Sequence, residues 1–162
     1  MSLDHDTKQR VPTRSINVSC TDCSLNPICL PVAVDNKQLD ELDRIIKRSK
    51  PMKKGEHLFR ASDPFASIYA VRSGTIKTYS VTEDGKEQVT GFYLPGEVLG
   101  IDGINTNVHS NSAKALETAA VCEIPFDKLE VLSAQIPSLQ RHFFQLMSRE
   151  IQADQQLIML LS

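Results

Sequence analysis

Three of the four cysteines of this chain lie within the ten-residue stretch CTDCSLNPIC. Cys20, Cys23 and Cys29 follow a C-x2-C-x5-C spacing, and the fourth, Cys122, comes much later in the chain. Thiolates are soft ligands that suit iron–sulfur clusters, zinc and copper(I). The four cysteines together therefore predict a metal centre.

The distribution of the cysteines favours one kind of centre. Structural zinc sites usually take their ligands from two short pairs, each closing its own loop. Here three thiols share one loop and the fourth stands alone, as is typical of an iron–sulfur cluster in which each iron takes one cysteine. A structural zinc ion and unliganded or redox-active thiols remain as alternatives. Cys122 by itself would be interpreted as a small core residue, so its assignment as a ligand rests on the other three cysteines.

Two polar residues flank the second cysteine of the motif. Asp22 and Ser24 are types that form turns by bonding to the nearby backbone. Next to a cluster, the same carboxylate and hydroxyl would change the local field and the access of water, and so tune the rate of oxidation. Both interpretations stay open.

Length and composition restrict the class of protein. A chain of 162 residues has room for one compact domain, and a net charge of −2 shows no basic excess of the kind that a DNA-contacting face carries. No apolar run approaches the ~20 residues of a membrane span, and the polar start lacks the apolar core of a signal peptide. We therefore expect a cytoplasmic location, where thiols stay reduced and disulfides are a poor explanation of the cysteines.

The first part of the chain divides into a tail and a helix. Residues 1–34 are expected to form an N-terminal tail and the cysteine loop, and residues 35–50 a helix. Asp35 at the N-cap and Gln38 three residues later make a capping-box pattern, and Pro51 is expected to end the helix.

The middle of the chain, residues 51–132, predicts short strands. Ser73-Gly74 and Asp84-Gly85 are hairpin-type signals, and Pro95-Gly96 marks another turn. Such close spacing indicates a β-sandwich or β-roll. Residues 112–117 and 119–125 are expected to be a last pair of strands, which places Cys122 within a strand.

The C-terminal part predicts helices: a short one over 126–135, then a long one from Pro137 to the end, in a segment bounded at 133–162. The long helix carries two apolar stripes. The first, interrupted by Glu150, is expected to pack on the strands and comprises Leu139, Phe143, Leu146, Ala153, Leu157 and Leu160. The second has the 3-4-3-4-3 spacing of a heptad seam, which predicts a parallel homodimer, and comprises Phe144, Met147, Ile151, Asp154, Ile158 and Leu161.

Catalytic patterns are missing from the sequence. His5, His57, His109 and His142 are scattered, and each is expected to be a surface or packing residue. No Ser-His-Asp order, H-E-x-x-H or phosphate loop is visible. The sequence therefore predicts a protein that is not an enzyme.

Several segments resemble one known family. CTDCSLNPICLP, ALETAAVCEIPFDKL and LMSREIQADQQLIMLLS, in this order, are similar to the sensory part of the FNR branch of the CRP/FNR transcription regulators. The resemblance covers nearly the whole chain from about Cys20 to Ser162. It implies an α+β, mainly β fold: a CRP-like β-roll (double-stranded β-helix or jelly roll) followed by a long C-terminal dimerisation helix.

The resemblance also implies a mechanism. Cys20, Cys23, Cys29 and Cys122 match the ligands of an oxygen-labile 4Fe–4S cluster, which oxygen converts to a 2Fe–2S form and which aerobic preparation can remove. In that family the intact cluster favours a homodimer that binds DNA without oxygen. The implied partners are DNA and RNA polymerase, reached through the full-length regulator, with molecular oxygen as the signal and no membrane.

The chain departs from its family pattern in two ways. Family members continue into a winged helix-turn-helix domain, whereas this chain stops at LIMLLS, so we expect it to be the sensory part of a longer regulator. Relatives that bind cyclic nucleotides place an arginine-serine pair after a G-E loop to hold the cyclic phosphate. The corresponding stretch HSNSAKA has no arginine to pair with a phosphate, which argues against a cyclic-nucleotide-binding domain. This function is therefore kept only as the third alternative.

Overall fold

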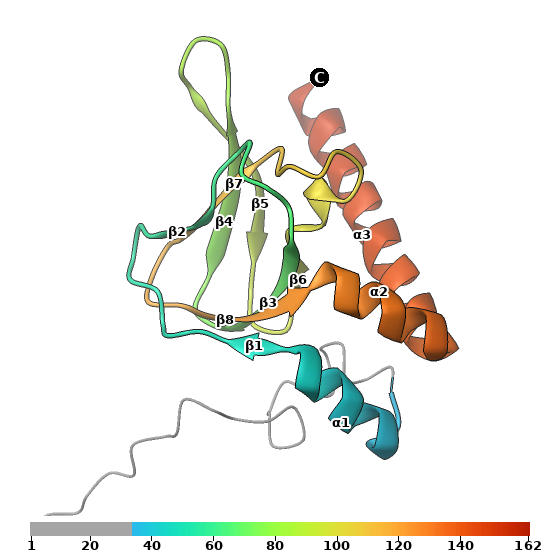
Figure 1. The fold of residues 1–162 in the computed structure, drawn as a ribbon. Helices are drawn as coiled ribbons and strands as arrows, with labels where there is room; N and C mark the ends of the chain where they lie inside the picture. The colour runs from blue at the N-terminus through green and yellow to red at the C-terminus, as the bar shows by residue number, and fades with distance from the viewer. Residues whose placement is uncertain (1–33) are drawn as a thin grey trace, which may run out of the picture.

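The computed structural model describes residues 34–162, and Figure 1 shows strands gathered on one side with helices beside them. The elements, in chain order, are α1 (Asn36–Ile45), β1 (Lys47–Arg48), β2 (His57–Phe59), β3 (Ser67–Ser73), β4 (Ile76–Val81), β5 (Glu87–Tyr93), β6 (Val98–Leu99), the 3₁₀ helix η2 (Ile101–Gly103), β7 (Ser112–Ala115), β8 (Ala120–Pro125), α2 (Phe126–Gln135) and α3 (Pro137–Leu161).

The described strands form two four-stranded antiparallel sheets, ordered β1-β8-β3-β6 and β2-β7-β4-β5. Apolar side chains from both sheets fill the space between them, and the largest of those with no measurable exposure are Val71, Ile76 and Leu99. Alternation along the strands sends one set of side chains inward and the other outward. The predicted mainly-β roll followed by a long helix is confirmed.

A second apolar cluster lies between the β1-β8-β3-β6 sheet and the three helices. Ile68 and Ile124 contribute from the sheet, and burial of such side chains contributes about 1.5–3 kcal/mol each. The helices contribute Leu42 from α1, Leu129 and Leu132 from α2, and Leu139 and Phe143 from α3. This cluster fixes the helices on the outer face of the sheet that contains Cys122.

The first helix begins as predicted and ends earlier than predicted. Asp35 accepts a hydrogen bond from the Gln38 backbone N–H at 2.9 Å, and the Gln38 side chain accepts one from Asp35 N–H at 3.1 Å, so the capping box is present. The helix ends at Ile45, not at residue 50, because Ile46 is extended and Lys47–Arg48 pair with β8. Strand pairing overrides the helical pattern of the last residues.

The turn signals lead to different connections. Asp84-Gly85 is a true hairpin turn: β4 and β5 pair with Val81 opposite Glu87, and Gly85 has a φ of 77°. The prediction of a hairpin at Ser73-Gly74 is wrong, because β3 and β4 belong to different sheets. Gly74 is required there, since a Cβ would lie 2.5 Å from the Thr118 carbonyl oxygen.

The prediction that the last two strands form a pair is also wrong, because β7 and β8 lie in different sheets. β7 pairs with β2 and β4, whereas β8 pairs with β1 and β3. The bounds of α2 and α3 agree with the expected 126–135 and Pro137 onward, and Pro137 occupies the first turn of α3. Among residues 34–162, none of the helices has the length and apolarity that a membrane crossing requires.

Candidate metal centre

Cys122 lies in the middle of β8, as the sequence predicts. It stands opposite Arg48 of β1 and opposite Ala70 of β3. Its side chain is partly buried and packs against the apolar cluster beneath the helices. The thiol is therefore on the helix-covered face of the sheet, outside the core of the roll.

The charged neighbours of Cys122 are engaged with other groups. Arg48 Nη2 lies 2.5 Å from Asp43 Oδ1, which joins β1 to the end of α1. Glu123, the next residue of β8, accepts a hydrogen bond from the Ser67 hydroxyl at 3.0 Å. Both interactions fix the strands on either side of the thiol.

The other predicted ligands, Cys20, Cys23 and Cys29, and the candidate tuning residues Asp22 and Ser24, lie outside the described residues. Within residues 34–162 there is no group of three or more His, Cys, Asp or Glu side chains that could hold a metal ion. Cys122 is thus not part of a group of three or more such side chains within this part of the chain.

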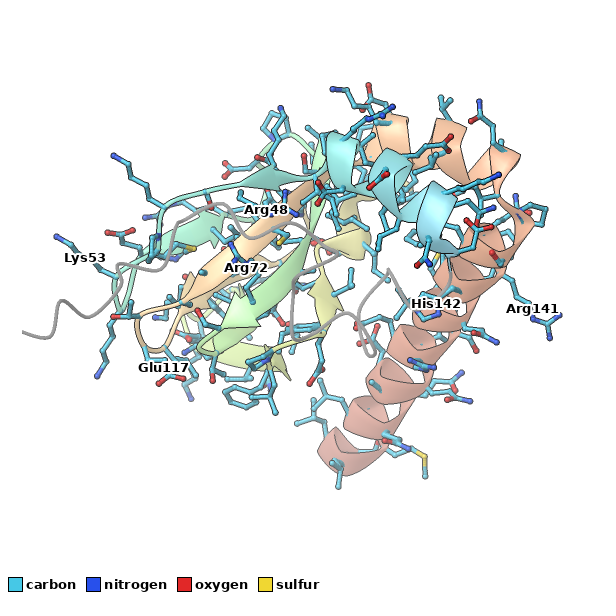
Figure 2. All side chains as sticks on the ribbon, turned by 90° about the horizontal axis from the view of Figure 1, so that it is seen from below. Arg48, Lys53, Arg72, Glu117, Arg141 and His142 are labelled. Carbon is cyan, nitrogen blue, oxygen red and sulfur yellow. The ribbon has the colours of Figure 1, made fainter. Side chains whose placement is uncertain are left out.

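The predicted dimer seam lies along α3. Its apolar members Phe144, Ile151, Ile158 and Leu161 are 56–64% exposed. Asp154 is exposed among them, and Met147 is partly buried against the cluster that also contains Cys122. Figure 2 shows Arg141, near the start of the same helix, extending away from the protein. The seam is therefore an exposed apolar stripe whose first part touches the body of the domain.

The first stripe of α3 packs on the domain over only part of its length. Leu139 and Phe143 are buried, and Leu146 and Leu157 are partly buried. Ala153 is exposed, and Leu160 is 83% exposed. A helix of 25 residues is about 37 Å long, so its last turns extend beyond the surface that supports the first ones. The expectation that the whole stripe packs on the strands is wrong for Ala153 and Leu160.

A cavity of about 260 Å³ separates the roll from α3. Tyr93 of β5 donates a hydrogen bond across it to Glu150 Oε2 at 2.9 Å. The cavity is lined from the roll by Thr78, Thr90, Tyr93, Gly100, Ile101, Asp102 and Asn111, and from α3 by Met147, Glu150, Ile151 and Asp154. Three of these side chains are carboxylates and none is an arginine or lysine.

The surroundings of Glu150 raise the pKa of its carboxyl group. Burial, with Asp154, Glu97 and Asp102 nearby, raises the pKa of Glu150, although the hydrogen bond from Tyr93 opposes this shift. Burial and the charge of Glu150 raise the pKa of Tyr93 in turn. The field in the cavity is negative, and a phosphate placed there would be repelled.

His109 and Asp102 form a contact that the sequence analysis does not predict. His109 is 3% exposed and its ring lies parallel to that of Phe59, with 3.7 Å between centroids, so the expectation of a packing role is confirmed. Its Nδ1 lies 3.0 Å from Asp102 Oδ1. No local pattern marks Asp102, because its partners come seven to nine residues later.

A protein-family model described as "Cyclic nucleotide-binding domain" matches residues 49–135, which span the roll and α2. Two solved structures confirm this fold at low identity. The catabolite activator protein of Thermus thermophilus has a TM-score of 0.69 at 22% identity and covers 81% of this chain and 62% of its own. The sensor domain of the regulator DNR from Pseudomonas aeruginosa has a TM-score of 0.68 at 18% identity, over 78% of this chain and 85% of its own.

Curated relatives are much closer in sequence. Transcriptional activator protein anr of Pseudomonas aeruginosa is 55% identical over 143 residues, which are 88% of this chain and 59% of that protein. Fumarate and nitrate reduction regulatory protein of Yersinia pestis is 48% identical over 95% of this chain and 62% of its own. Electron transport regulator A of Shewanella oneidensis is 46% identical over 100% of this chain and 65% of its own. The chain spans less than two thirds of these relatives, and it belongs to the cyclic nucleotide-binding domain family, within the CRP/FNR group of transcription regulators.

Proposed function

We propose that this chain is the oxygen-sensing domain of an anaerobic transcription regulator. Cys20, Cys23, Cys29 and Cys122 hold an oxygen-labile 4Fe–4S cluster, and its integrity controls dimerisation through α3. Dimerisation in turn controls DNA binding by the longer protein. The relatives named as transcriptional activators and as fumarate and nitrate reduction regulators support the biological role.

One observation carries the proposal. Val34, which follows the cysteine loop, packs against the same apolar cluster as Cys122. Cys29 is five residues before Val34, and five residues of extended chain span at most about 17 Å. The covalent chain therefore limits Cys29 to about 17 Å from Val34, which supports a shared metal centre for Cys29 and Cys122.

The donor set fits the group. Four thiolates are the ligands that a 4Fe–4S cluster takes. Residues 34–162 contain no group of three or more His, Cys, Asp or Glu side chains that could hold a metal ion, so we propose that the further thiolates on a metal at Cys122 come from Cys20, Cys23 and Cys29. A bound cluster would supply a link between the loop and β8 that oxygen can break.

The route from Cys122 to the dimer seam is short. Met147 belongs to the seam and packs against the same cluster as Cys122 and Val34. A change in how the loop before Val34 is held therefore acts on the surface that supports α3. We propose that this surface biases α3 toward the paired state when the four cysteines are tied together.

The two other functions are less well supported. A structural zinc ion would use the same thiols but would not respond to oxygen. A cyclic nucleotide would bring its phosphate toward Asp102, Glu150 and Asp154 rather than toward an arginine. The family fold alone does not make this chain a cyclic-nucleotide receptor.

The remaining parts of the proposal concern the longer protein. We propose a cytoplasmic regulator without catalytic activity. We propose that the longer protein contacts DNA and RNA polymerase through its other parts. The net charge of this chain, −2, does not favour binding to DNA.

The experiment is a spectrum of protein purified without oxygen. We expect a coloured protein with about four irons and four sulfides per chain that bleaches in air. Sedimentation of the same samples should show more dimer before exposure to air than after it. Colourless protein with one tightly held zinc per chain would overturn the proposal.

A further inference from the structure

The Asp102 carboxylate accepts several hydrogen bonds from one short segment. Its Oδ2 accepts from the backbone N–H of Ser110 at 2.8 Å and from that of Asn111 at 3.0 Å. The Ser110 hydroxyl donates to the same oxygen at 3.2 Å. The other oxygen, Oδ1, faces His109 Nδ1 at 3.0 Å.

These donors form an anion-binding site. Consecutive backbone N–H groups that point at one oxygen make a concavity suited to an anion, and bonds to a charged acceptor are about twice as strong as neutral ones. Asp102 lies in η2 and the donors lie immediately before β7, so the carboxylate closes the loop of residues 103–111. The anion in this site belongs to the chain itself.

The surroundings hold the site in place. The Asp102 side chain is 17% exposed and that of His109 only 2%. The His109 ring is stacked on Phe59 and meets the Phe65 ring edge-on. The backbone of the 103–111 loop is also bonded to a neighbouring loop, through His109 N–H to Asp63 O at 2.9 Å and Phe65 N–H to Asn107 O at 2.9 Å.

We propose that Asp102 is a built-in ligand, whose carboxylate occupies the anion site formed by Ser110 and Asn111 and holds the 103–111 loop closed without a small molecule. The family resemblance implies that this stretch, HSNSAKA, corresponds to the one where cyclic-nucleotide-binding relatives carry the arginine-serine pair for the cyclic phosphate. Here an internal carboxylate takes the place of the external anion. The loop is therefore permanently closed, and the domain receives no signal at this position.

The kind of small anion that fits the site in Asp102→Ala is set by the carboxylate that the substitution removes. Asp102→Ala removes one carboxylate and leaves its donors facing a space of that size. A small monocarboxylate such as formate replaces the missing group most closely. Inorganic phosphate is larger and more highly charged, and it would also meet the nearby Glu150 and Asp154.

The test is chemical rescue of the Asp102→Ala chain. We expect its Tm to fall by roughly 5 °C or more, because several charge-assisted hydrogen bonds are lost. Sodium formate should restore part of this loss with a saturable concentration dependence. Sodium chloride at the same ionic strength should not restore the Tm of Asp102→Ala. The two salts should have equal effects on the Tm of the parent.

A matched control is Asp63→Ala. The Asp63 carboxylate accepts one backbone hydrogen bond, from Arg60 N–H at 2.9 Å, and it is exposed. This variant should lose less stability and show no specific response to formate. Equal Tm values for the parent and Asp102→Ala, or an equal response of both variants to formate, would contradict the proposal.

A measurement on the unmodified chain covers the case in which Asp102→Ala does not fold. The Ser110 and Asn111 amides should exchange with solvent deuterium slowly in the absence of any ligand, and cyclic AMP should not slow them further. Exchange as fast as that of an exposed loop amide, or strong protection on adding cyclic AMP, would overturn the proposal. Neither result depends on iron, so the outcome is separate from that of the proposed oxygen sensor.

Discussion

The Tyr93 hydroxyl donates a hydrogen bond to Glu150 at 2.9 Å, joining the roll to the middle of α3 across 57 positions of sequence. This bond lies where the buried part of α3 gives way to its exposed part. Leu139 and Phe143 before it are buried, whereas Ile151 and Ile158 after it are exposed. The pair therefore marks the end of the support that the roll gives to the helix.

The first prediction concerns the charge of Glu150. Its pKa is raised from 4.5, mainly by burial, so above pH 4.5 the folded chain binds more protons there than the unfolded chain does. Its contribution to stability is complete below pH 4.5 and is lost as pH rises through the raised pKa. Glu150→Gln keeps an acceptor for Tyr93 without the charge, and we expect it to raise Tm at pH 7 by a few degrees.

The control for this prediction is Tyr93→Phe, which removes the donor and leaves the charge. We expect it to lose about 1 kcal/mol of unfolding free energy at pH 7. Thermal unfolding of the three proteins from pH 4 to pH 8 separates these effects. If Glu150→Gln follows the same pH profile as the parent, the Glu150 carboxylate does not carry this dependence.

The second prediction concerns Asp154 in the dimer seam. In a parallel symmetric pair each Asp154 faces its own copy, and two carboxylates ~8 Å apart at an effective dielectric of ~20 repel by about 2 kcal/mol. Asp154→Ala should therefore dimerise about 30-fold more tightly and should do so without a cluster. Sedimentation of cluster-free protein measures this directly.

Ile151→Glu is the opposite change in the same stripe. Ile151 is 58% exposed, so the substitution should leave the monomer folded. We expect it to stay monomeric even when the cluster is intact, because it adds a charge and removes an apolar contact from the seam. If cluster-free Asp154→Ala is as monomeric as its parent, Asp154 is an ordinary solvated residue.

The third prediction concerns the isolated cysteine. If Cys122 is a ligand, Cys122→Ser should lose the cluster as completely as Cys23→Ser, since a hydroxyl does not replace a thiolate. Iron and sulfide analysis of anaerobic preparations, with circular dichroism to check the fold, provides the measurement. Full iron content in Cys122→Ser would remove this residue from the ligand set and leave it as a packing residue of β8.

The fourth prediction compares two buried serines. The Ser133 hydroxyl in α2 has no hydrogen-bond partner among the described residues, whereas the Ser67 hydroxyl donates to Glu123. Ser133→Ala should gain about 1 kcal/mol of unfolding free energy, because a buried group without a partner costs its desolvation. Ser67→Ala should lose a similar amount. Chemical denaturation of both variants tests the contrast, and a loss in both would show that Ser133 is satisfied in solution.

The sequence alone determined those features whose bonds join near neighbours. The capping box of α1 links Asp35 to Gln38, three residues away, and α2 and α3 follow from periodicity and from Pro137. The hairpin at Asp84-Gly85 and the position of Cys122 in a strand also came from local patterns. The cysteine spacing itself remains a prediction, because the loop lies outside the described residues.

Tertiary structure decided the features that join distant residues. Whether Ser73-Gly74 closes a hairpin or crosses between sheets depends on which strands pair, and the dipeptide alone carries no such information. Pairing with β8 likewise ended α1 at Ile45, ahead of Pro51. Tyr93, Asp102 and Glu150 line one cavity only because the roll and α3 fold against each other. Residue spacing encodes bonds between neighbours along the chain, whereas burial and the meeting of charges are properties of the packed molecule.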